Sequence, residues 1–85
     1  KNAVRRNFPD CGDLDNASEW ACLRPSTPDG PPILGKSPYE NLYLNTGHGT
    51  LGWTQAAGSA KLVADIIEGN NPEINMTGLT IDRFL

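Results

Sequence analysis

The sequence has few of the residues on which several functional classes depend. It contains two cysteines and one histidine, and Cys11 and Cys22 stand far from His48. These residues fit neither the spacing of a zinc site nor a C-x-x-C redox motif, so we predict no metal site. No run of about 18 apolar residues and no signal-peptide pattern occurs, so we predict no membrane-spanning segment. Without a secretion signal we expect two free thiols, with a single disulfide as the alternative.

Basic charge is scarce as well. Seven Lys and Arg residues stand against ten Asp and Glu residues, which gives a net charge of −3 and a pI near 4.8. Proteins that bind nucleic acid present a basic stripe or patch to the phosphates. The only local basic cluster, made by Lys1, Arg5 and Arg6, is too short for that role. The sequence therefore predicts no nucleic-acid partner.

Core-forming residues are few for a chain of 85 residues. Hydrophobic residues make 38% of the sequence, aromatic residues make 7%, and nine glycines and seven prolines favour loops. Such a chain forms one small domain at most. We expect the core to include Trp20, Trp53, Tyr39 and Tyr43. Because one helix covers only one face of a small sheet, we expect another domain to cover the other face.

The stretch NLYLNTGHGTLGWT, residues 41–54, organises the rest of the chain. It begins with an apolar strand predicted at Leu42–Leu44, breaks at three glycines, and leads into a helix predicted from about Thr50 to Glu68. The first amides of a helix have no partner within it, and the helix dipole adds to them. Such a junction favours an anion or a carbonyl oxygen. The alternative is that the glycines serve backbone geometry alone.

The spacing of these glycines, G-H-G-x-x-G, is that of neither common nucleotide motif. It lacks the lysine of a phosphate-binding loop, and no full βαβ unit precedes it, as a dinucleotide fingerprint requires.

A hairpin is predicted upstream of this stretch, within residues 18–35. Trp20–Leu23 reads as a strand, and Pro28-Asp29-Gly30 is a turn signal that would return the chain to a second strand at Ile33–Leu34. A second turn at Ser37-Pro38-Tyr39 leads to the strand at Leu42–Leu44. The predicted fold class is α+β, with two to three short strands and one main C-terminal helix.

Short signals mark the remaining segments. Lys1–Asn7 resembles the last turns of a helix that begins before the first residue, and Phe8-Pro9 would end it. Gly69 is placed to end the long helix in the left-handed conformation. Leu79–Ile81 has weak strand character. We expect the sequence to be a piece of a longer protein.

Two side chains are candidates for a site. Arg24 stands between a predicted strand end and a proline, so its guanidinium can be held in place to bind a carboxylate bidentately. The alternative is a surface ion pair with Asp29. His48 lies between two glycines, but no carboxylate at a useful spacing would orient it as an acid or base. No serine has the context of a nucleophile, so we predict no catalytic side chain.

Two segments carry a family resemblance. Residues 20–35, WACLRPSTPDGPPILG, resemble the pattern W-x-G-x-R-P-x-T-P-D-G-x-P-x-I-G of the D-amino-acid-oxidase-like FAD family. Residues 41–54 are similar to the C-terminal part of this family as found among bacterial D-amino acid dehydrogenases, and the following AAGSAKLVADIIEG continues the pattern. The resemblance extends over about residues 4–82. It departs at Cys22, where the family commonly has glycine.

The resemblance implies a place for the chain in a larger protein. Residues 1–85 would be one C-terminal segment of a two-domain flavoprotein, whose Rossmann-type domain binds the FAD pyrophosphate in the N-terminal part. Residues 18–35 would be a hairpin of the substrate-side region. Residues 41–69 would be the final strand, glycine-rich turn and helix of the FAD domain. The segment alone is expected to be inactive.

The resemblance also implies site residues. Arg24 would pair with the substrate carboxylate. The flavin ring would be lined by Gly47, His48, Gly49, Thr50, Leu51 and Gly52. The start of the helix would face the flavin edge where reduction places negative charge, so its amides would stabilise the reduced form.

The implied activity is oxidation of D-amino acids to 2-oxo acids and ammonia. The Cα hydrogen would leave as hydride to the flavin, so no side-chain base is required. The implied partners are the D-amino acid, the N-terminal FAD domain of the parent enzyme and a respiratory electron acceptor. The implied location is cytoplasmic, including a peripheral position at the inner face of the bacterial inner membrane. Two alternatives stay open: an oxidase of glycine, sarcosine or another secondary amine, and a non-catalytic interaction module.

Overall fold

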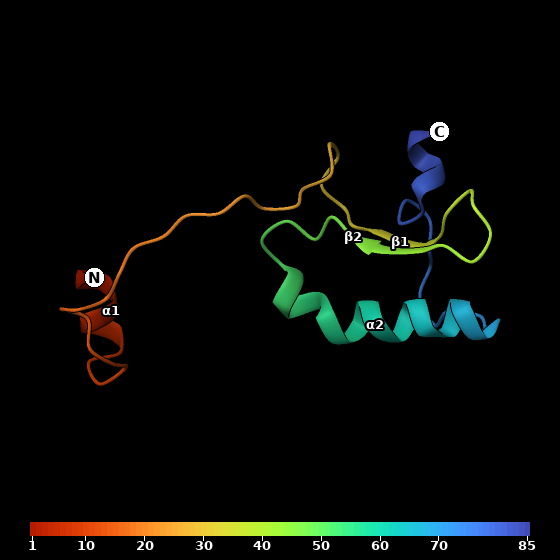
Figure 1. The fold of residues 1–85 in the computed structure, drawn as a ribbon. Coiled ribbons are helices and arrows are strands. Elements are labelled where there is room, and N and C mark those ends of the chain that lie inside the picture. Colours follow the sequence, from red (N-terminus) through yellow and green to blue (C-terminus); the bar gives the residue numbers. More distant parts are fainter.

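The computed structural model describes residues 1–85 and has two parts (Figure 1). The N-terminal part, residues 1–24, contains helix α1 (Asn2–Asn7). The sheet–helix unit, residues 25–85, contains β1 (Ile33–Lys36), β2 (Tyr43–Thr46), α2 (Gly52–Glu68) and a 3-10 helix, η1 (Ile81–Phe84). The Cα radius of gyration is 17.8 Å, whereas a compact domain of this length has a radius of roughly 12 Å. The chain is therefore elongated, because its N-terminal part extends away from the rest.

The sheet has two antiparallel strands, β1 and β2, with Ile33 opposite Thr46 and Lys36 opposite Tyr43. The loop 37–42 joins them, and the Ser37 N–H donates to the Leu42 carbonyl oxygen at 3.0 Å. The other edge of β1 is bonded once, where the Leu34 N–H donates to the Leu79 carbonyl oxygen at 2.7 Å. With one sheet and one main helix, the predicted α+β fold class is confirmed.

The predicted pairing of Trp20–Leu23 with Ile33–Leu34 is wrong, because β1 pairs with β2 instead. Residues 17–24 make no hydrogen bond with any other part of the chain. The following segment holds four prolines, which lack the N–H that a ladder needs. The turn at Pro28-Asp29-Gly30 is present, but it follows a single β-bridge between Ser26 and His48 rather than a strand.

The other predicted elements are present with shifted bounds. The strand predicted at Leu42–Leu44 is β2, which begins one residue later and continues to Thr46. The long helix begins at Gly52 rather than near Thr50, and it ends at Glu68 as predicted.

The ends of the helices follow the local signals of the sequence. Gly69 has a φ of 81°, and its N–H donates to the carbonyl oxygen of Ile66, so the predicted left-handed helix end is confirmed. Helix α1 ends at Asn7, before Phe8. At the C-terminus, 3-10 helix η1 begins at Ile81, so the strand character predicted at Leu79–Ile81 is wrong apart from the single hydrogen bond that the Leu79 carbonyl oxygen accepts from Leu34.

The core lies between α2 and one face of the sheet and is small (Figure 1). Its buried residues are Leu34 and Gly35 of β1, Gly47 after β2, and Ser59 and Leu62 of α2. The spacing of Ser59 and Leu62, three residues apart, places both on the same side of the helix. This contact fixes α2 against the sheet.

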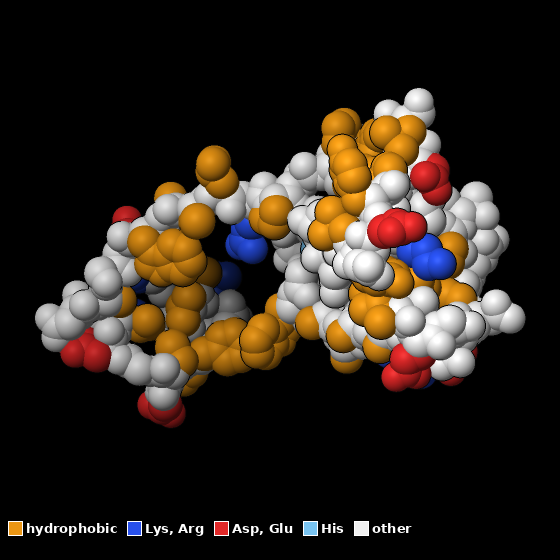
Figure 2. All heavy atoms as spheres, turned by 45° about the vertical axis from the view of Figure 1, so that its right-hand side comes forward, with side chains coloured by type: hydrophobic (Ala, Val, Ile, Leu, Met, Phe, Trp, Pro, Cys, Tyr) orange, Lys and Arg blue, Asp and Glu red, His pale blue; other side chains and the backbone are white.

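The prediction that the aromatic residues pack in the core is wrong for three of four. The exposed fractions are 85% for Trp20, 97% for Trp53 and 74% for Tyr39, whereas Tyr43 is half-buried. Trp53 points away because it lies six residues before Ser59, off the face of α2 that meets the sheet. Figure 2 shows apolar side chains at the surface of both parts of the chain. Their cover by another domain stays a prediction.

Two further observations concern the N-terminal part and the helices. Cys11 and Cys22 are both free and exposed, which agrees with the expectation of free thiols. No helix in the structure combines the length and the hydrophobicity needed to cross a membrane.

The two tryptophans provide a test of this architecture. Both side chains are almost fully exposed, but the backbone at Trp20 is unbonded and the backbone at Trp53 belongs to α2. A protease needs an extended segment, so cleavage at Trp53 requires local unfolding of the helix. We expect chymotrypsin to cut after Trp20 at least about 10-fold faster than after Trp53, as followed by mass spectrometry. The urea-unfolded chain is the control. Equal rates in native buffer would contradict an ordered α2.

Candidate functional site

The candidate site is built around the glycine turn, residues 47–52, which leads from β2 into α2. Gly47 and Gly49 have φ angles of 79° and 56°, in the left-handed region that favours glycine. Gly47 is also constrained by its surroundings, since a Cβ at this position would lie 2.6 Å from Cγ2 of Thr27. The absence of a side chain at Gly47 thus allows the segment around Thr27 to lie directly against the turn.

Two groups of backbone amides lie in the glycine turn and in the helix start that follows it. The first group closes the turn: the Gly49 N–H donates to the Pro25 carbonyl oxygen at 2.9 Å, and the Leu51 N–H donates to the His48 carbonyl oxygen at 3.0 Å. The second group is the first turn of α2, where the N–H groups of Gly52, Trp53 and Thr54 make no hydrogen bond within the chain.

These helix-start amides are free to bind an electron-rich group. No side chain caps the N-terminus of α2, and its first turn contains no acidic residue that would compete for the amides. The amides and the positive end of the helix dipole therefore act together at one place. An anion or a polarised carbonyl oxygen is the group that this arrangement stabilises.

The His48 side chain connects the glycine turn to α2. Its Nε2 lies 2.9 Å from Oγ of Ser59, and Ser59 is only 7% exposed. Which of the two atoms donates depends on the imidazole tautomer. No carboxylate hydrogen-bonds to the ring, so the contact orients the turn rather than an acid–base pair.

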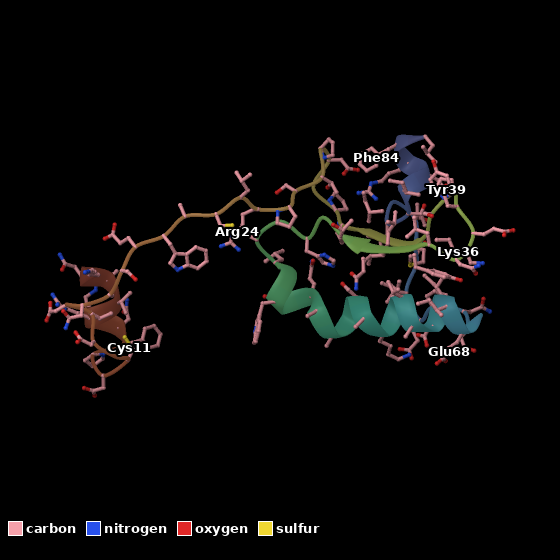
Figure 3. All side chains as sticks on the ribbon, in the orientation of Figure 1. Cys11, Arg24, Lys36, Tyr39, Glu68 and Phe84 are labelled. Atoms are coloured by element: carbon pink, nitrogen blue, oxygen red, sulfur yellow. The ribbon has the colours of Figure 1, made fainter.

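Arg24 lies on the extended segment that leads to the turn at Pro28-Asp29-Gly30 (Figure 3). The residue that follows it, Pro25, accepts the hydrogen bond from Gly49, which brings the backbone next to Arg24 into contact with the turn. The Arg24 side chain is exposed and makes no hydrogen bond or ion pair. The alternative that Arg24 pairs with Asp29 is wrong, because Asp29 pairs with Arg83. The guanidinium of Arg24 is therefore free for a ligand.

The pair of Arg83 and Asp29 has no signal in the sequence, since 54 positions separate the two residues. Nε of Arg83 donates to Oδ2 of Asp29 at 2.7 Å. This hydrogen bond holds the pKa of the Asp29 carboxyl below its usual value. Because the pKa is lower in the folded chain, the pair stabilises the fold above the usual pKa of an aspartate. That stabilisation is lost as the pH falls through the lowered value.

A hollow of about 400 Å³ lies along α2 and is lined by Leu34 of β1 and by Thr54, Ser59 and Leu62 of α2, among others. It contains neither Arg24 nor any residue of the glycine turn, and its lining is mainly apolar. The charged groups at its rim are already paired, since Nζ of Lys61 lies 2.8 Å from Asp65 and 3.4 Å from Glu73. The Asp65 carboxylate raises the pKa of Lys61. The hollow therefore adjoins the candidate site at Thr54 and Ser59 but offers it no free charged group.

The structure thus brings the predicted site residues into two adjacent segments, the glycine turn and the segment after Arg24. No group of three or more His, Cys, Asp or Glu side chains is placed to hold a metal ion. What the sequence missed is the set of contacts that join these segments, above all those of Thr27, Ser59 and Arg83.

Comparison with known proteins gives the chain a family context. Residues 1–66 match the family described as DAO, FAD dependent oxidoreductase. A protein named D-amino acid dehydrogenase from Paramagnetospirillum magneticum is 60% identical over 81 residues, which are 95% of this chain and 19% of the relative. The protein of that name from Granulibacter bethesdensis is 54% identical over 84 residues, 99% of this chain and 20% of the relative.

A third protein named D-amino acid dehydrogenase, from Rhizorhabdus wittichii, is 60% identical over 77 residues, 91% of this chain and 18% of the relative. The chain therefore spans about a fifth of the length of the curated relatives that it matches. No solved structure matches the chain.

Two glycine substitutions test the contact at the start of the glycine turn. Gly47→Ala forces a side chain into the left-handed region and against Thr27, so we expect it to cost about 1–2 kcal/mol or more in the free energy of unfolding. Gly58→Ala is the control, because a Cβ there meets nothing within 4 Å in a helical backbone. We expect it to stabilise α2 by about 0.5–1 kcal/mol. Urea unfolding followed by circular dichroism measures both, and equal losses would contradict the proposed contact.

Proposed function

The chain belongs to the FAD-dependent oxidoreductase family, and from this membership we propose that it is the C-terminal segment of an FAD-dependent D-amino acid dehydrogenase. The parent enzyme would oxidise D-amino acids to 2-oxo acids and ammonia. Identities of 54–60% to proteins named D-amino acid dehydrogenase, over 91–99% of the chain, support this activity. Because the chain spans about a fifth of those proteins, we propose that it is inactive alone.

The observation that carries the proposal is the start of α2 at the glycine turn. Three amides, those of Gly52, Trp53 and Thr54, are free and point out of an uncapped helix. This set of donors fits a flavin, whose ring carries a carbonyl edge and gains negative charge on reduction. We propose that residues 47–52 line the ring. When bound, FAD supplies the acceptor for the hydride of the substrate.

The roles within the glycine turn differ by residue. The amides of Gly49 and Leu51 are used inside the chain, so these residues would shape the turn. Gly49 would also let the ring approach closely, because it carries no side chain. His48 would hold the turn on α2 through Ser59. The donors toward the flavin would come from the first turn of α2.

Arg24 is proposed to bind the substrate carboxylate. Its guanidinium has no partner within the chain, and its backbone neighbour is bonded to the glycine turn. A guanidinium matches a carboxylate with two parallel hydrogen bonds, which would fix the orientation of the substrate as well as bind it. Its position beside the turn would place the substrate near the flavin.

The remaining partners follow from the relatives and the family. We propose that the N-terminal FAD domain of the parent enzyme covers the exposed apolar side chains of this segment. The relatives are named dehydrogenases rather than oxidases, which favours a respiratory acceptor over oxygen. A peripheral position at the inner face of the bacterial inner membrane would suit that acceptor.

A chimeric enzyme tests the function directly. In it, this chain replaces the matching fifth of the Paramagnetospirillum magneticum relative. We expect the chimera to retain FAD and to oxidise D-alanine with an artificial electron acceptor. Oxidation of sarcosine but not D-alanine would favour the amine-oxidase alternative. A folded chimera without FAD would favour a non-catalytic module.

Substitution of Arg24 tests the carboxylate anchor. Because a hydrogen bond to a charged group contributes about 1.5–3 kcal/mol, Arg24→Ala in the chimera is expected to raise KM for D-alanine at least about 10-fold. FAD occupancy should not change. Arg6→Ala is the control, since Arg6 is an exposed arginine of α1 without an ion pair. Steady-state kinetics measure KM for D-alanine in both variants. An unchanged KM in Arg24→Ala would show that this residue is not part of the site.

Two left-handed glycines test the flavin contact. Gly49→Val places a branched side chain in the turn, so we expect loss of FAD from the chimera. Gly69→Val imposes a similar backbone strain, since φ is 56° at Gly49 and 81° at Gly69, but it lies at the far end of α2. We therefore expect Gly69→Val to retain FAD. Flavin absorbance after gel filtration measures occupancy, and equal retention by both variants would contradict the contact.

A further inference from the structure

Arg83, near the C-terminus, is one of the most fully hydrogen-bonded side chains of the protein. Its guanidinium donates to both carboxylate oxygens of Asp29, at 2.7 and 3.2 Å, to the Pro31 carbonyl oxygen at 2.6 Å, and to the Thr80 carbonyl oxygen at 3.1 Å. The side chain is only 13% exposed. Its guanidinium carbon also lies 4.4 Å from the centre of the Phe84 ring. These contacts leave the guanidinium little freedom to bind a ligand itself.

Three of these four hydrogen bonds go to the proline turn, residues 27–31. This turn is closed by Thr27, whose hydroxyl donates to the Pro31 carbonyl oxygen at 2.8 Å and accepts from the Gly30 N–H at 3.0 Å. The Pro31 oxygen therefore accepts from Thr27 and Arg83 together. Arg83 thus ties the C-terminal tail to a turn that is already closed on itself.

The proline turn is in turn joined to the candidate site. Cγ2 of Thr27 occupies the space beside Gly47 that a Cβ would fill. Ser26 forms a β-bridge with His48, and the Pro25 carbonyl oxygen accepts from Gly49. A continuous series of contacts therefore runs from Arg83 through residues 25–31 to the glycine turn.

Arg24 immediately precedes this series and makes no hydrogen bond or ion pair of its own. Its side chain makes no hydrogen bond, and residues 17–23 before it make none either. The backbone of Arg24 is thus fixed from one side only, by the segment that Arg83 holds. Loss of the Arg83 contacts would leave the Pro25–Gly49 hydrogen bond and the Ser26–His48 bridge as the ties of this segment, with residues 27–31 no longer held from the side of the C-terminal tail.

We propose that Arg83 is a positioning residue for substrate binding, which holds the proline turn so that Arg24 meets the substrate carboxylate at a fixed distance from the glycine turn. This inference rests on the proposed function, because it assumes that Arg24 binds the carboxylate. Residues after 66 lie outside the family match. The proposed role of Arg83 therefore gives this C-terminal tail a part in substrate affinity. Arg83 acts through Arg24 and does not touch the substrate.

The chimera and a double-mutant cycle test this role. Arg83→Gln is expected to raise KM for D-alanine about 10-fold with kcat and FAD occupancy little changed. The dissociation constant of propionate, which carries the carboxylate of D-alanine without the amine, should rise by a similar factor. In the Arg24→Ala background, Arg83→Gln should have almost no further effect, because the group that it positions is absent. Arg83→Lys should restore part of the affinity.

Two further variants make the result decisive. Lys61→Gln is the matched control, since it removes a cation from the Lys61–Asp65 pair without contact with the proline turn; it should leave KM unchanged. Asp29→Asn keeps the Arg83 hydrogen bonds to Pro31 and Thr80. If Arg83→Gln fails to fold, Asp29→Asn therefore provides the test in its place. It should raise KM in the wild-type background only.

The outcomes separate this inference from the proposed function. If Arg24→Ala leaves KM unchanged, the carboxylate anchor of the proposed function is itself wrong. If Arg24→Ala raises KM but Arg83→Gln and Asp29→Asn do not, only the role of Arg83 is overturned. The same holds if the effects of Arg24→Ala and Arg83→Gln on affinity multiply, because Arg83 would then act independently of Arg24.

Discussion

The absence of a side chain at Gly47 is the constraint on which the site depends. It lets Thr27 lie directly against the start of the glycine turn, where any Cβ would collide with it. The neighbouring backbone contacts, from Ser26 to His48 and from Gly49 to Pro25, then align the two segments. One segment follows Arg24, and the other leads into α2. The proposed carboxylate anchor, Arg24, and the helix-start donors are thus connected through the contacts between these two segments.

The fold around this contact is held by few buried groups, because so little of the chain lies inside. Only five residues are buried, and just two of them, Leu34 and Leu62, are large and hydrophobic. Burial at roughly 25 cal/mol per Å² has to offset the loss of chain entropy, and a core of this size leaves a small surplus. Side-chain hydrogen bonds such as Arg83–Asp29 and His48–Ser59 therefore contribute a larger share of the stability of this fold than they would in a domain with a full core. The exposed Trp20 and Trp53 agree with the proposal that the N-terminal FAD domain of the parent enzyme covers this segment.

Membership of an FAD-dependent family and the geometry of the helix start support each other. The family supplies the kind of ligand, a flavin with a carbonyl edge. The structure supplies the amides of Gly52, Trp53 and Thr54, which lack any partner within the chain. Neither observation requires a catalytic side chain, and His48 is engaged with Ser59. Binding and orientation are therefore the contributions that this segment would make to the proposed hydride transfer.

The sequence by itself determined the local features. The glycine turn, the end of α2 at Gly69 and the turn at Pro28-Asp29-Gly30 follow from residue types whose backbone preferences act over a few positions. Tertiary structure alone decided which strands pair, because the sequence placed a predicted strand on either side of Ile33–Leu34 and only the folded chain shows that β1 pairs with β2. It also decided the contacts of Arg83, His48 and Thr27. These contacts join residues that are far apart in the chain. Local backbone preferences do not determine which distant carbonyl or carboxylate oxygen a side chain will contact.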